Sequence, residues 1–168
     1  LIGEAVETLE IERGMTVGHT RLIPMIETPA ALLIAVDIAR ADGRVAAMVL
    51  GGEDFATAMG MEPAADTLMQ AKLQCLTAAR AAGVIPLGFI GTVADYGDRE
   101  AFRETVRWSR RFGFEGASCI HPSGVEILNQ EMSPGADEID WAERVVSAYA
   151  EAEAAGTGAI TIDGKMID

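Results

Sequence analysis

The sequence predicts an α/β fold in which four short parallel strands alternate with helices. Four runs of residues are apolar throughout, as strands are when both faces of a parallel sheet are covered. The runs end near Ile26, Leu50, Ile90 and Ile120, and the spacing between these ends leaves room for helical connections. Four βα units fit either half of a (β/α)8 barrel or a small open sheet. Length alone favours the open sheet, because a whole barrel takes about 250 residues.

The first βα unit combines a strand over residues 22–26 with a helix over residues 30–40. Thr28 and Pro29 mark the start of this helix. The hydroxyl of Thr28 can accept a hydrogen bond from a backbone N–H of the first turn, and a proline at the first helical position has no N–H to leave unpaired.

A second strand is predicted over residues 45–50, where Gly51 and Gly52 end it, and a short helix is expected over residues 53–59. A longer helix follows over residues 66–82. It stops at Gly83, because glycine readily adopts the left-handed conformation that closes a helix.

The third predicted strand covers residues 84–90 and the fourth covers residues 117–120. Between them, Asp98 is expected to cap a helix that runs through Arg111. The fourth strand contains Cys119, which we interpret as a core thiol because no histidine or cation adjoins it.

A break in the pattern at residues 133–135, with the sequence Ser-Pro-Gly, is the clearest boundary signal. We therefore expect residues 1–133 to form the βα part and residues 134–168 to form a C-terminal extension. Within the extension, apolar residues at helical spacing predict an amphipathic helix over residues 134–155.

Composition excludes several classes of protein. The chain has 168 residues, 49% of them hydrophobic, with 26 acidic and 13 basic residues and a formal net charge of −13. This acid excess argues against binding to nucleic acid, which needs clustered lysine and arginine. The longest apolar candidate, residues 30–39, is interrupted by Asp37 and is shorter than the roughly 20 residues that span a bilayer, so we expect no membrane segment.

The start of the chain has no basic segment typical of a signal peptide. Cys75 and Cys119 are the only cysteines, too few for a disulfide framework. We therefore expect a cytoplasmic, reducing location and two buried thiols.

Acidic side chains follow two neighbouring strands of the predicted sheet. Glu27 follows the first strand, and Glu53 and Asp54 follow the second after the two glycines. Adjacent strands lie about 5 Å apart, so one carboxylate from each could share a divalent ion, and oxygen ligands suit Mg²⁺ better than Zn²⁺. Alternatively, the acids only stabilise helix N-termini, by about 0.3 to 1 kcal/mol each.

A histidine, His121, directly follows the fourth predicted strand. We interpret it as a hydrogen-bonded structural group rather than a catalytic base, because a lone histidine at a strand end is more often structural.

Four stretches together resemble the citrate lyase beta-subunit-like family, which includes malyl-CoA and citramalyl-CoA lyases and lies within the phosphoenolpyruvate/pyruvate-binding barrel superfamily. The stretches match in order and spacing over essentially the whole chain, at residues 23–28 (IPMIET), 51–56 (GGEDFA), 116–122 (GASCIHP) and 163–168 (DGKMID).

This resemblance implies a (β/α)8 TIM barrel, of which residues 1–133 would be the C-terminal half and residues 134–168 a helical lid segment. It also implies that Mg²⁺ is held by Glu27 and Asp54, which singles out Asp54 over its neighbour. The carboxylate of Asp168 would act as the acid/base in the site of a neighbouring subunit of a homo-oligomer, a trimer or hexamer.

The implied reaction is a Mg²⁺-dependent, reversible Claisen-type cleavage of a 3-hydroxyacyl-CoA, such as malyl-, citramalyl- or citryl-CoA, to an acyl-CoA and a 2-oxo acid. Two alternatives remain: a metal-dependent aldolase that acts on free hydroxy-oxo acids without CoA, and a non-catalytic fragment or association module.

Family members begin with about four further βα units. Because half a barrel has unpaired strand edges, we expect this chain alone not to close into an active enzyme.

Overall fold

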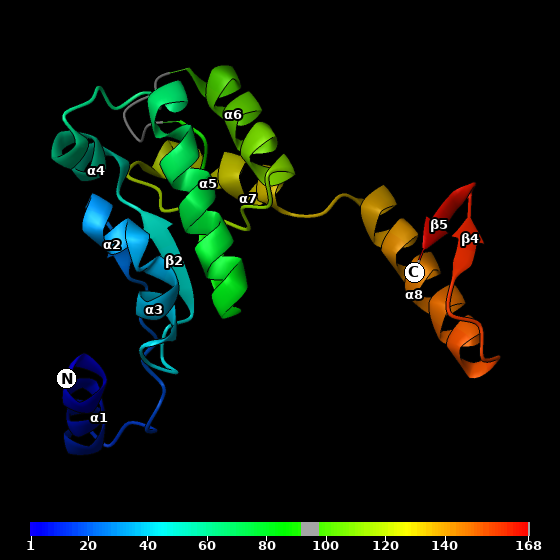
Figure 1. The fold of residues 1–168 in the computed structure, drawn as a ribbon, viewed down its shortest axis with the longest axis horizontal. Helices are drawn as coiled ribbons and strands as arrows, with labels where there is room; N and C mark the ends of the chain where they lie inside the picture. The colour runs from blue at the N-terminus through cyan, green and yellow to red at the C-terminus, as the bar shows by residue number, and fades with distance from the viewer. Residues whose placement is uncertain (92–97, 168) are drawn as a thin grey trace. The chain divides into compact units, whose positions relative to one another are not determined.

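The computed structural model describes residues 1–91 and 98–167 (Figure 1). The chain divides into two compact units, Leu1–Met132 and Ser133–Asp168. The helices of unit 1 are α1 (Ile2–Glu12), α2 (Pro29–Leu33), α3 (Ala35–Arg40), α4 (Gly52–Met59), α5 (Ala65–Ala82), α6 (Arg99–Arg111) and α7 (Val125–Met132), with a 3-10 helix η1 (Pro122–Gly124) before α7.

A parallel sheet forms the centre of unit 1, as the sequence predicts. Its strands β1 (Met25–Ile26), β2 (Ala47–Leu50) and β3 (Ile85–Leu87) lie in the order β1-β2-β3. All four residues of the central strand are buried. This arrangement confirms an α/β fold with parallel strands.

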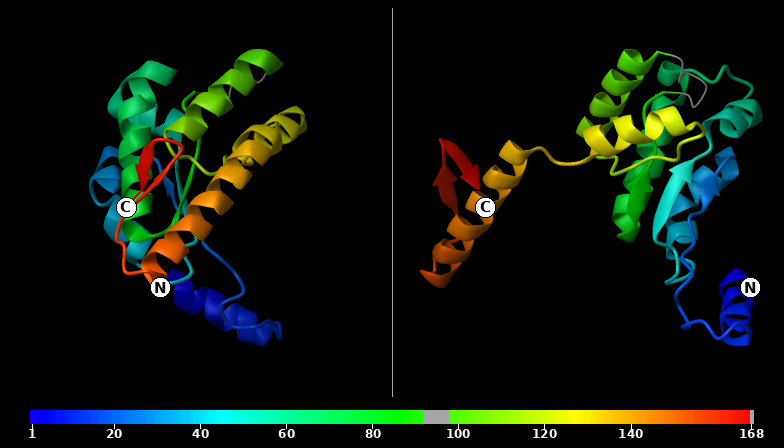
Figure 2. Two further views of the ribbon diagram at one scale, coloured as in Figure 1. Left: turned by 90° about the vertical axis from the view of Figure 1, so that its right-hand side faces the viewer. Right: turned by 180° about the vertical axis from the view of Figure 1, so that it is seen from behind.

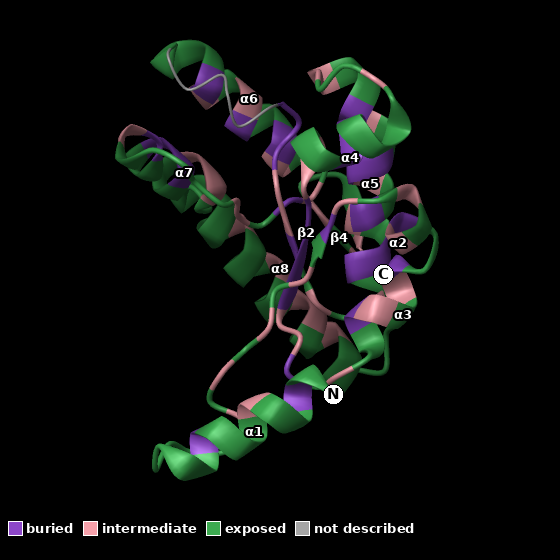
Figure 3. Cartoon of the chain, turned by 90° about the vertical axis from the view of Figure 1, so that its left-hand side faces the viewer, coloured by how far each residue is buried: buried purple, intermediate pink, exposed green. Residues whose placement is uncertain are grey.

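The helices α2, α3 and α5 cover one face of this sheet (Figures 1 and 2). Ile26, Met48 and Leu50 point to that face and join one buried cluster with side chains of the helices. In Figure 3, the buried residues gather on β2 and on the adjoining sides of the helices.

The opposite face of the sheet carries exposed apolar side chains. Side chains alternate between the faces along a strand, and the register Met25↔Val49 and Ala47↔Ile85 places Met25 and Ile85 on this second face together with Ile23. Ile23, Met25 and Ile85 are 55%, 51% and 44% exposed. Among the described residues the helices pack on one face. On the other face Met25 and Ile85 of the flanking strands are exposed, whereas Ala47 and Val49 of the central strand are buried.

Local signals in the sequence define the helix ends correctly. Thr28 accepts a hydrogen bond from the backbone N–H of Ala31, and Asp98 accepts two at the start of α6. Gly83 ends α5 in the left-handed conformation at φ 75°. The predicted helix over residues 30–40 is instead two helices, because Ile34 leaves the helical conformation at φ −115°.

The fourth predicted strand, over residues 117–120, is wrong. The structure has a single parallel bridge there, Leu87↔Gly116, and Ile120 is 62% exposed. The buried apolar residue of this stretch is Phe114, three residues before the predicted strand. Among the described residues the stretch pairs with β3 on one side only, so little of a ladder forms.

A second buried cluster joins α6 and α7. It contains Phe89, Phe102, Val106, Ile127 and Leu128. Two arginines of α6, Arg103 and Arg107, form ion pairs with Glu131 of α7 and hold the two helices together at one end of the cluster.

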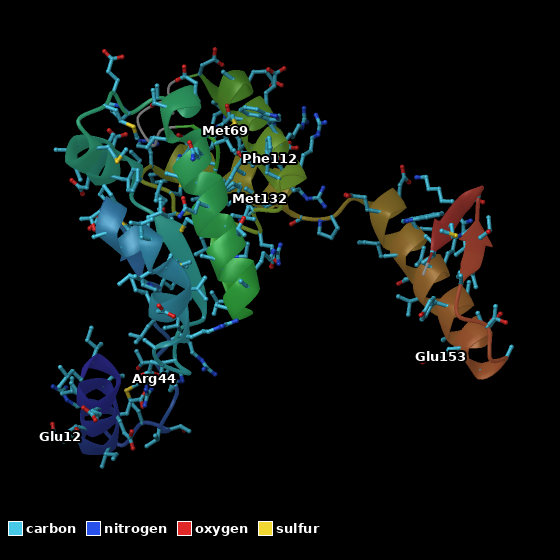
Figure 4. All side chains as sticks on the ribbon, in the orientation of Figure 1. Glu12, Arg44, Met69, Phe112, Met132 and Glu153 are labelled. Carbon is cyan, nitrogen blue, oxygen red and sulfur yellow. The ribbon has the colours of Figure 1, made fainter. Side chains whose placement is uncertain are left out.

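Helix α1 is attached through a buried ion pair. The carboxylate of Glu10 contacts the guanidinium of Arg44, which is labelled in Figure 4, at 2.9 Å and also accepts hydrogen bonds from the backbone N–H groups of Gly18 and Thr20. The hydrogen bond from Arg44 is the main reason why the pKa of Glu10 is lowered to about 2.

Unit 2 consists of α8 (Ala136–Ala154) and a hairpin of β4 (Ile160–Ile162) and β5 (Lys165–Ile167). The helix agrees with the predicted helix over residues 134–155, whereas the hairpin is not predicted from the sequence. Two cations lie over the ring of Trp141, the guanidinium of Arg144 of the same helix at 5.5 Å and the ammonium of Lys165 of β5 at 5.4 Å. The contact from Lys165 and the ion pair between Arg144 and Asp163 attach the hairpin to the helix.

In the described part of the chain, none of the helices has the length and apolar character required to cross a bilayer.

Candidate active site

The carboxyl ends of β1 and β2 bring Glu27 against Gly51. Ile26 pairs with Leu50, and the N–H of Gly51 donates a hydrogen bond of 2.9 Å to the carbonyl of Ile26. A Cβ atom at position 51 would lie 2.7 Å from Cγ and 3.0 Å from Oε1 of Glu27. The side chain of Glu27 therefore occupies space that is open only because residue 51 is glycine.

Glu27 lies on the face of the sheet opposite the helices. It follows Met25 by two residues, and strand alternation places these two side chains on the same side. Glu27 is half-buried. Its carboxylate is thus at the carboxyl edge of the sheet, where α/β proteins bind their ligands.

Asp54 lies in the first turn of α4, three residues after Gly51. Both Glu53 and Asp54 are exposed, and the N-terminal end of the helix favours their negative charge. The structure therefore places Glu27, after β1, and Asp54, in the first turn after β2, at the same edge of the sheet.

Among the described residues, the two candidate ligands at this edge, Glu27 and Asp54, both provide carboxylate oxygens. Among the described residues, no group of three or more histidine, cysteine, aspartate or glutamate side chains is arranged to hold a metal ion. Two carboxylates beside an open backbone fit Mg²⁺, because this ion keeps several waters and takes further oxygens from substrate. The pair therefore fits a magnesium site completed by water and substrate.

Lys72 is a buried cation near this edge that the sequence analysis missed. It belongs to α5 and is 8% exposed, and its ammonium donates hydrogen bonds to the carbonyls of Phe89 (2.7 Å) and Gly91. Burial lowers the pKa of Lys72 to about 8, and the nearby charge of Glu53 acts in the opposite direction. A signal was present in the sequence, since Lys72 follows Leu68 by four residues and precedes Cys75 by three, on the apolar side of the helix.

His121 is hydrogen-bonded, as expected. Its Nδ1 accepts a hydrogen bond from the backbone N–H of Ser123 and lies 2.7 Å from the Ser123 hydroxyl, so the ring caps η1.

The two cysteines differ, which corrects the expectation of two buried thiols. Cys75 is buried in the core, and burial raises the pKa of its thiol to about 12. Cys119 is exposed, because the strand expected to bury it does not form.

Asp168, the third residue that we expected in the site, lies outside the described residues. The hairpin that precedes it is described up to Ile167.

A parallel sheet with acidic residues at its carboxyl edge defines an α/β protein with a strand-end site. The chain matches the HpcH/HpaI aldolase/citrate lyase family over residues 2–122 and belongs to this family.

Two curated relatives cover most of the chain. The citrate lyase subunit beta of Leuconostoc mesenteroides subsp. cremoris is 34% identical over 161 residues, which are 95% of this chain and 53% of the relative. The (3S)-malyl-CoA thioesterase of Cereibacter sphaeroides is 39% identical over 146 residues, which are 86% of this chain and 50% of the relative. The chain thus spans about half the length of the curated relatives it matches.

Solved structures show the same fold. A citrate lyase from Burkholderia xenovorans superposes with a TM-score of 0.78 at 25% identity. The superposition covers 99% of this chain and 53% of the citrate lyase chain. Protein CitE from Mycobacterium tuberculosis, solved in complex with magnesium and acetate, superposes with a TM-score of 0.58 at 26% identity, covering 75% of this chain and 55% of its own.

Proposed function

We propose that this chain is the C-terminal half of a Mg²⁺-dependent CoA-ester lyase, which cleaves a 3-hydroxyacyl-CoA reversibly to an acyl-CoA and a 2-oxo acid. The observation that carries the proposal is the position of Glu27 against Gly51 at the carboxyl edge of a parallel sheet. Family membership and the names of the relatives, a citrate lyase subunit and a malyl-CoA thioesterase, support it.

Residues 1–133 would be half of a (β/α)8 barrel, and residues 134–168 a helical lid segment. Helices on one face of the sheet and exposed apolar side chains on the other support this arrangement, because a barrel has its helices outside and packs side chains inside. Glu27 and the exposed Met25 would both face the barrel interior.

In this proposal Glu27 and Asp54 hold Mg²⁺. When bound, the ion would polarise the keto group of the 2-oxo acid and offset negative charge that develops during carbon–carbon cleavage. Glu27 would be fixed in its rotamer by the backbone of Gly51, and the exposed Asp54 would approach from the first turn of α4. A CitE structure that contains magnesium supports a divalent ion at such a site.

Asp168 is the proposed acid/base. In condensation its carboxylate would remove a proton from the α carbon of the acyl-CoA, the resulting enolate would attack the keto carbon of the oxo acid, and the keto oxygen would take up a proton as it becomes the hydroxyl. In cleavage the hydroxyl would lose its proton as the keto group forms, and Asp168 would return a proton to the acyl-CoA carbon. The lid segment would carry Asp168 into the site of a neighbouring copy in a homo-oligomer.

An assay of the natural full-length protein tests this function. It is incubated with Mg²⁺, acetyl-CoA and either glyoxylate, pyruvate or oxaloacetate, and the products are identified by mass spectrometry. We expect a 3-hydroxyacyl-CoA adduct from at least one oxo acid and none after chelation of the metal. Absence of turnover with every CoA ester and oxo acid would overturn the proposal.

The family description also includes aldolases, so a metal-dependent aldolase that acts on free hydroxy-oxo acids is the second candidate. Omitting CoA from the assay separates the two. Cleavage of a free hydroxy-oxo acid at the same rate, without a thioester, would favour the aldolase.

A further inference from the structure

The backbone segment Phe89–Gly91, which follows β3, is held by two buried side chains from different helices. Lys72 of α5 donates to the carbonyls of Phe89 and Gly91. Ser109 of α6 accepts a hydrogen bond of 2.7 Å from the N–H of Ile90 and donates one of 2.6 Å to the carbonyl of Thr105. Three consecutive residues thus have polar backbone groups satisfied by side chains.

Both clamping side chains are buried. Ser109 is fully buried and Lys72 is 8% exposed. The ammonium of Lys72 also lies 5.3 Å from the centre of the Phe89 ring. A buried cation is costly unless it is well satisfied, so its two carbonyl partners and the aromatic face indicate a built arrangement rather than a stray surface lysine.

The stem of Lys72 connects this segment to the candidate active site. A Cβ atom at Gly52 would lie 3.7 Å from Cε of Lys72, and Gly52 is the first residue of α4, which carries Asp54 two residues later. The stem of Lys72 therefore passes close to the N-terminal turn after β2, and its ammonium fixes the segment after β3. These are neighbouring strand ends at the edge where the substrate would bind.

We propose that Lys72 is a positioning residue that sets the border of the substrate site by clamping the segment Phe89–Gly91, with Ser109 as the second half of the clamp. The inference rests on the proposed lyase function. Lys72 neither binds the metal nor reacts: its ammonium is occupied by the two carbonyls, so it acts through the backbone that it holds.

Removing the clamp should affect binding of the CoA ester more than the chemical step, because Glu27 and Asp54 stay in place. Lys72→Met keeps the length of the side chain and loses both hydrogen bonds. In the full-length protein we expect the KM for the CoA ester to rise by about tenfold or more, since small displacements of a positioning group have effects of this size. The kcat and the Mg²⁺ affinity should stay within about threefold. Lys72→Arg keeps the charge and donors and should recover part of the KM.

Arg80→Met is the matched control. Arg80 lies on the same helix, is exposed, and also holds a backbone carbonyl, that of Gly113, together with an ion pair to Glu115. Because it lies in the last turn of α5, away from Gly52, its loss should leave the KM unchanged.

Ser109→Ala provides a second arm in case Lys72→Met does not fold. It removes the acceptor of the Ile90 N–H and should raise the KM in the same direction, with Mg²⁺ affinity unchanged in calorimetry. Two results, each with an active wild-type enzyme, would overturn the inference alone. One is a KM that is unchanged in Ser109→Ala and in every folded Lys72 variant. The other is a KM that rises equally in Arg80→Met. A wild-type enzyme that turns over no CoA ester overturns the proposed function itself and this inference with it.

Discussion

At the carboxyl edge of the sheet, the side chain of Glu27 packs against the backbone of Gly51. A Cβ at position 51 would lie 2.7 Å from Cγ of Glu27. Gly51 has φ −80°, a conformation that any residue adopts, so a substitution there acts by contact and not by backbone strain. This relationship gives a test of the metal site that leaves both carboxylates present.

Gly51→Ala should move Glu27 out of its position. We expect Mg²⁺ affinity to fall by about 10- to 100-fold, the range seen when the support of a metal ligand is lost. Calorimetric titration of the full-length variant measures the change. Gly43→Ala is the control, because a Cβ at position 43 meets no atom within 4 Å. Equal affinity in both variants would mean that Glu27 does not bind the metal.

The Glu10–Arg44 pair should make stability depend on pH in the acid range. The pKa of Glu10 is lowered from 4.5 to about 2, mainly by the hydrogen bond from Arg44. Since the folded pKa lies below the unfolded one, the contribution of the pair is fully present above about pH 4.5 and is lost as the pH falls towards 2. Urea unfolding of wild type and Glu10→Gln between pH 2 and 6, roughly that window, should show the two curves converging at low pH. Parallel curves would contradict this assignment.

The two thiols should react at very different rates. Cys75 is buried with a pKa raised to about 12, so little thiolate forms near neutral pH, while Cys119 is exposed. Mass spectrometry after a short iodoacetamide treatment of the 168-residue chain should find the label on Cys119, and on Cys75 only after denaturation. Cys119→Ser serves as the control and should stay unlabelled. Early labelling of Cys75 would show that the core around α5 opens readily.

The hairpin of unit 2 should depend on the conformation of Asp163 more than on its charge. Asp163 has φ 49°, and its carboxylate forms an exposed ion pair of 2.7 Å with Arg144. Asp163→Asn keeps a residue that tolerates this conformation and should change little, because exposed ion pairs contribute little. Asp163→Val places a β-branched residue at positive φ and should destabilise the hairpin by about 1–2 kcal/mol. Hydrogen exchange of the β4 and β5 amides measures both, and a larger effect of Asn than of Val would contradict this reasoning.

The sequence was most informative where the signal is local. Caps at Thr28 and Asp98 and the glycine at position 83 act through hydrogen bonds and backbone angles of a few neighbouring residues, and the helix ends follow them. The positions of Glu27 and Asp54 after their strands follow from the same local pattern.

Features that depend on distant partners were missed. The fourth strand needs neighbours on both sides, and among the described residues Gly116 has one, so the apolar run around Cys119 stays exposed. Lys72 was not singled out because a charged residue in a helix is usually solvated. Its burial depends on carbonyls that lie 17 and 19 residues further along the chain.

The most direct measurement is a calorimetric titration of Mg²⁺, with a 2-oxo acid present, into the full-length protein and its Glu27→Gln variant. We expect one ion per subunit in the wild type and, in the variant, an affinity lower by at least the roughly 10- to 100-fold that loss of a supporting group costs. Thr28→Ser, which keeps the hydroxyl that caps α2 beside Glu27, should bind like the wild type. Equal Mg²⁺ affinity of wild type and Glu27→Gln would contradict a metal site at the ends of β1 and β2.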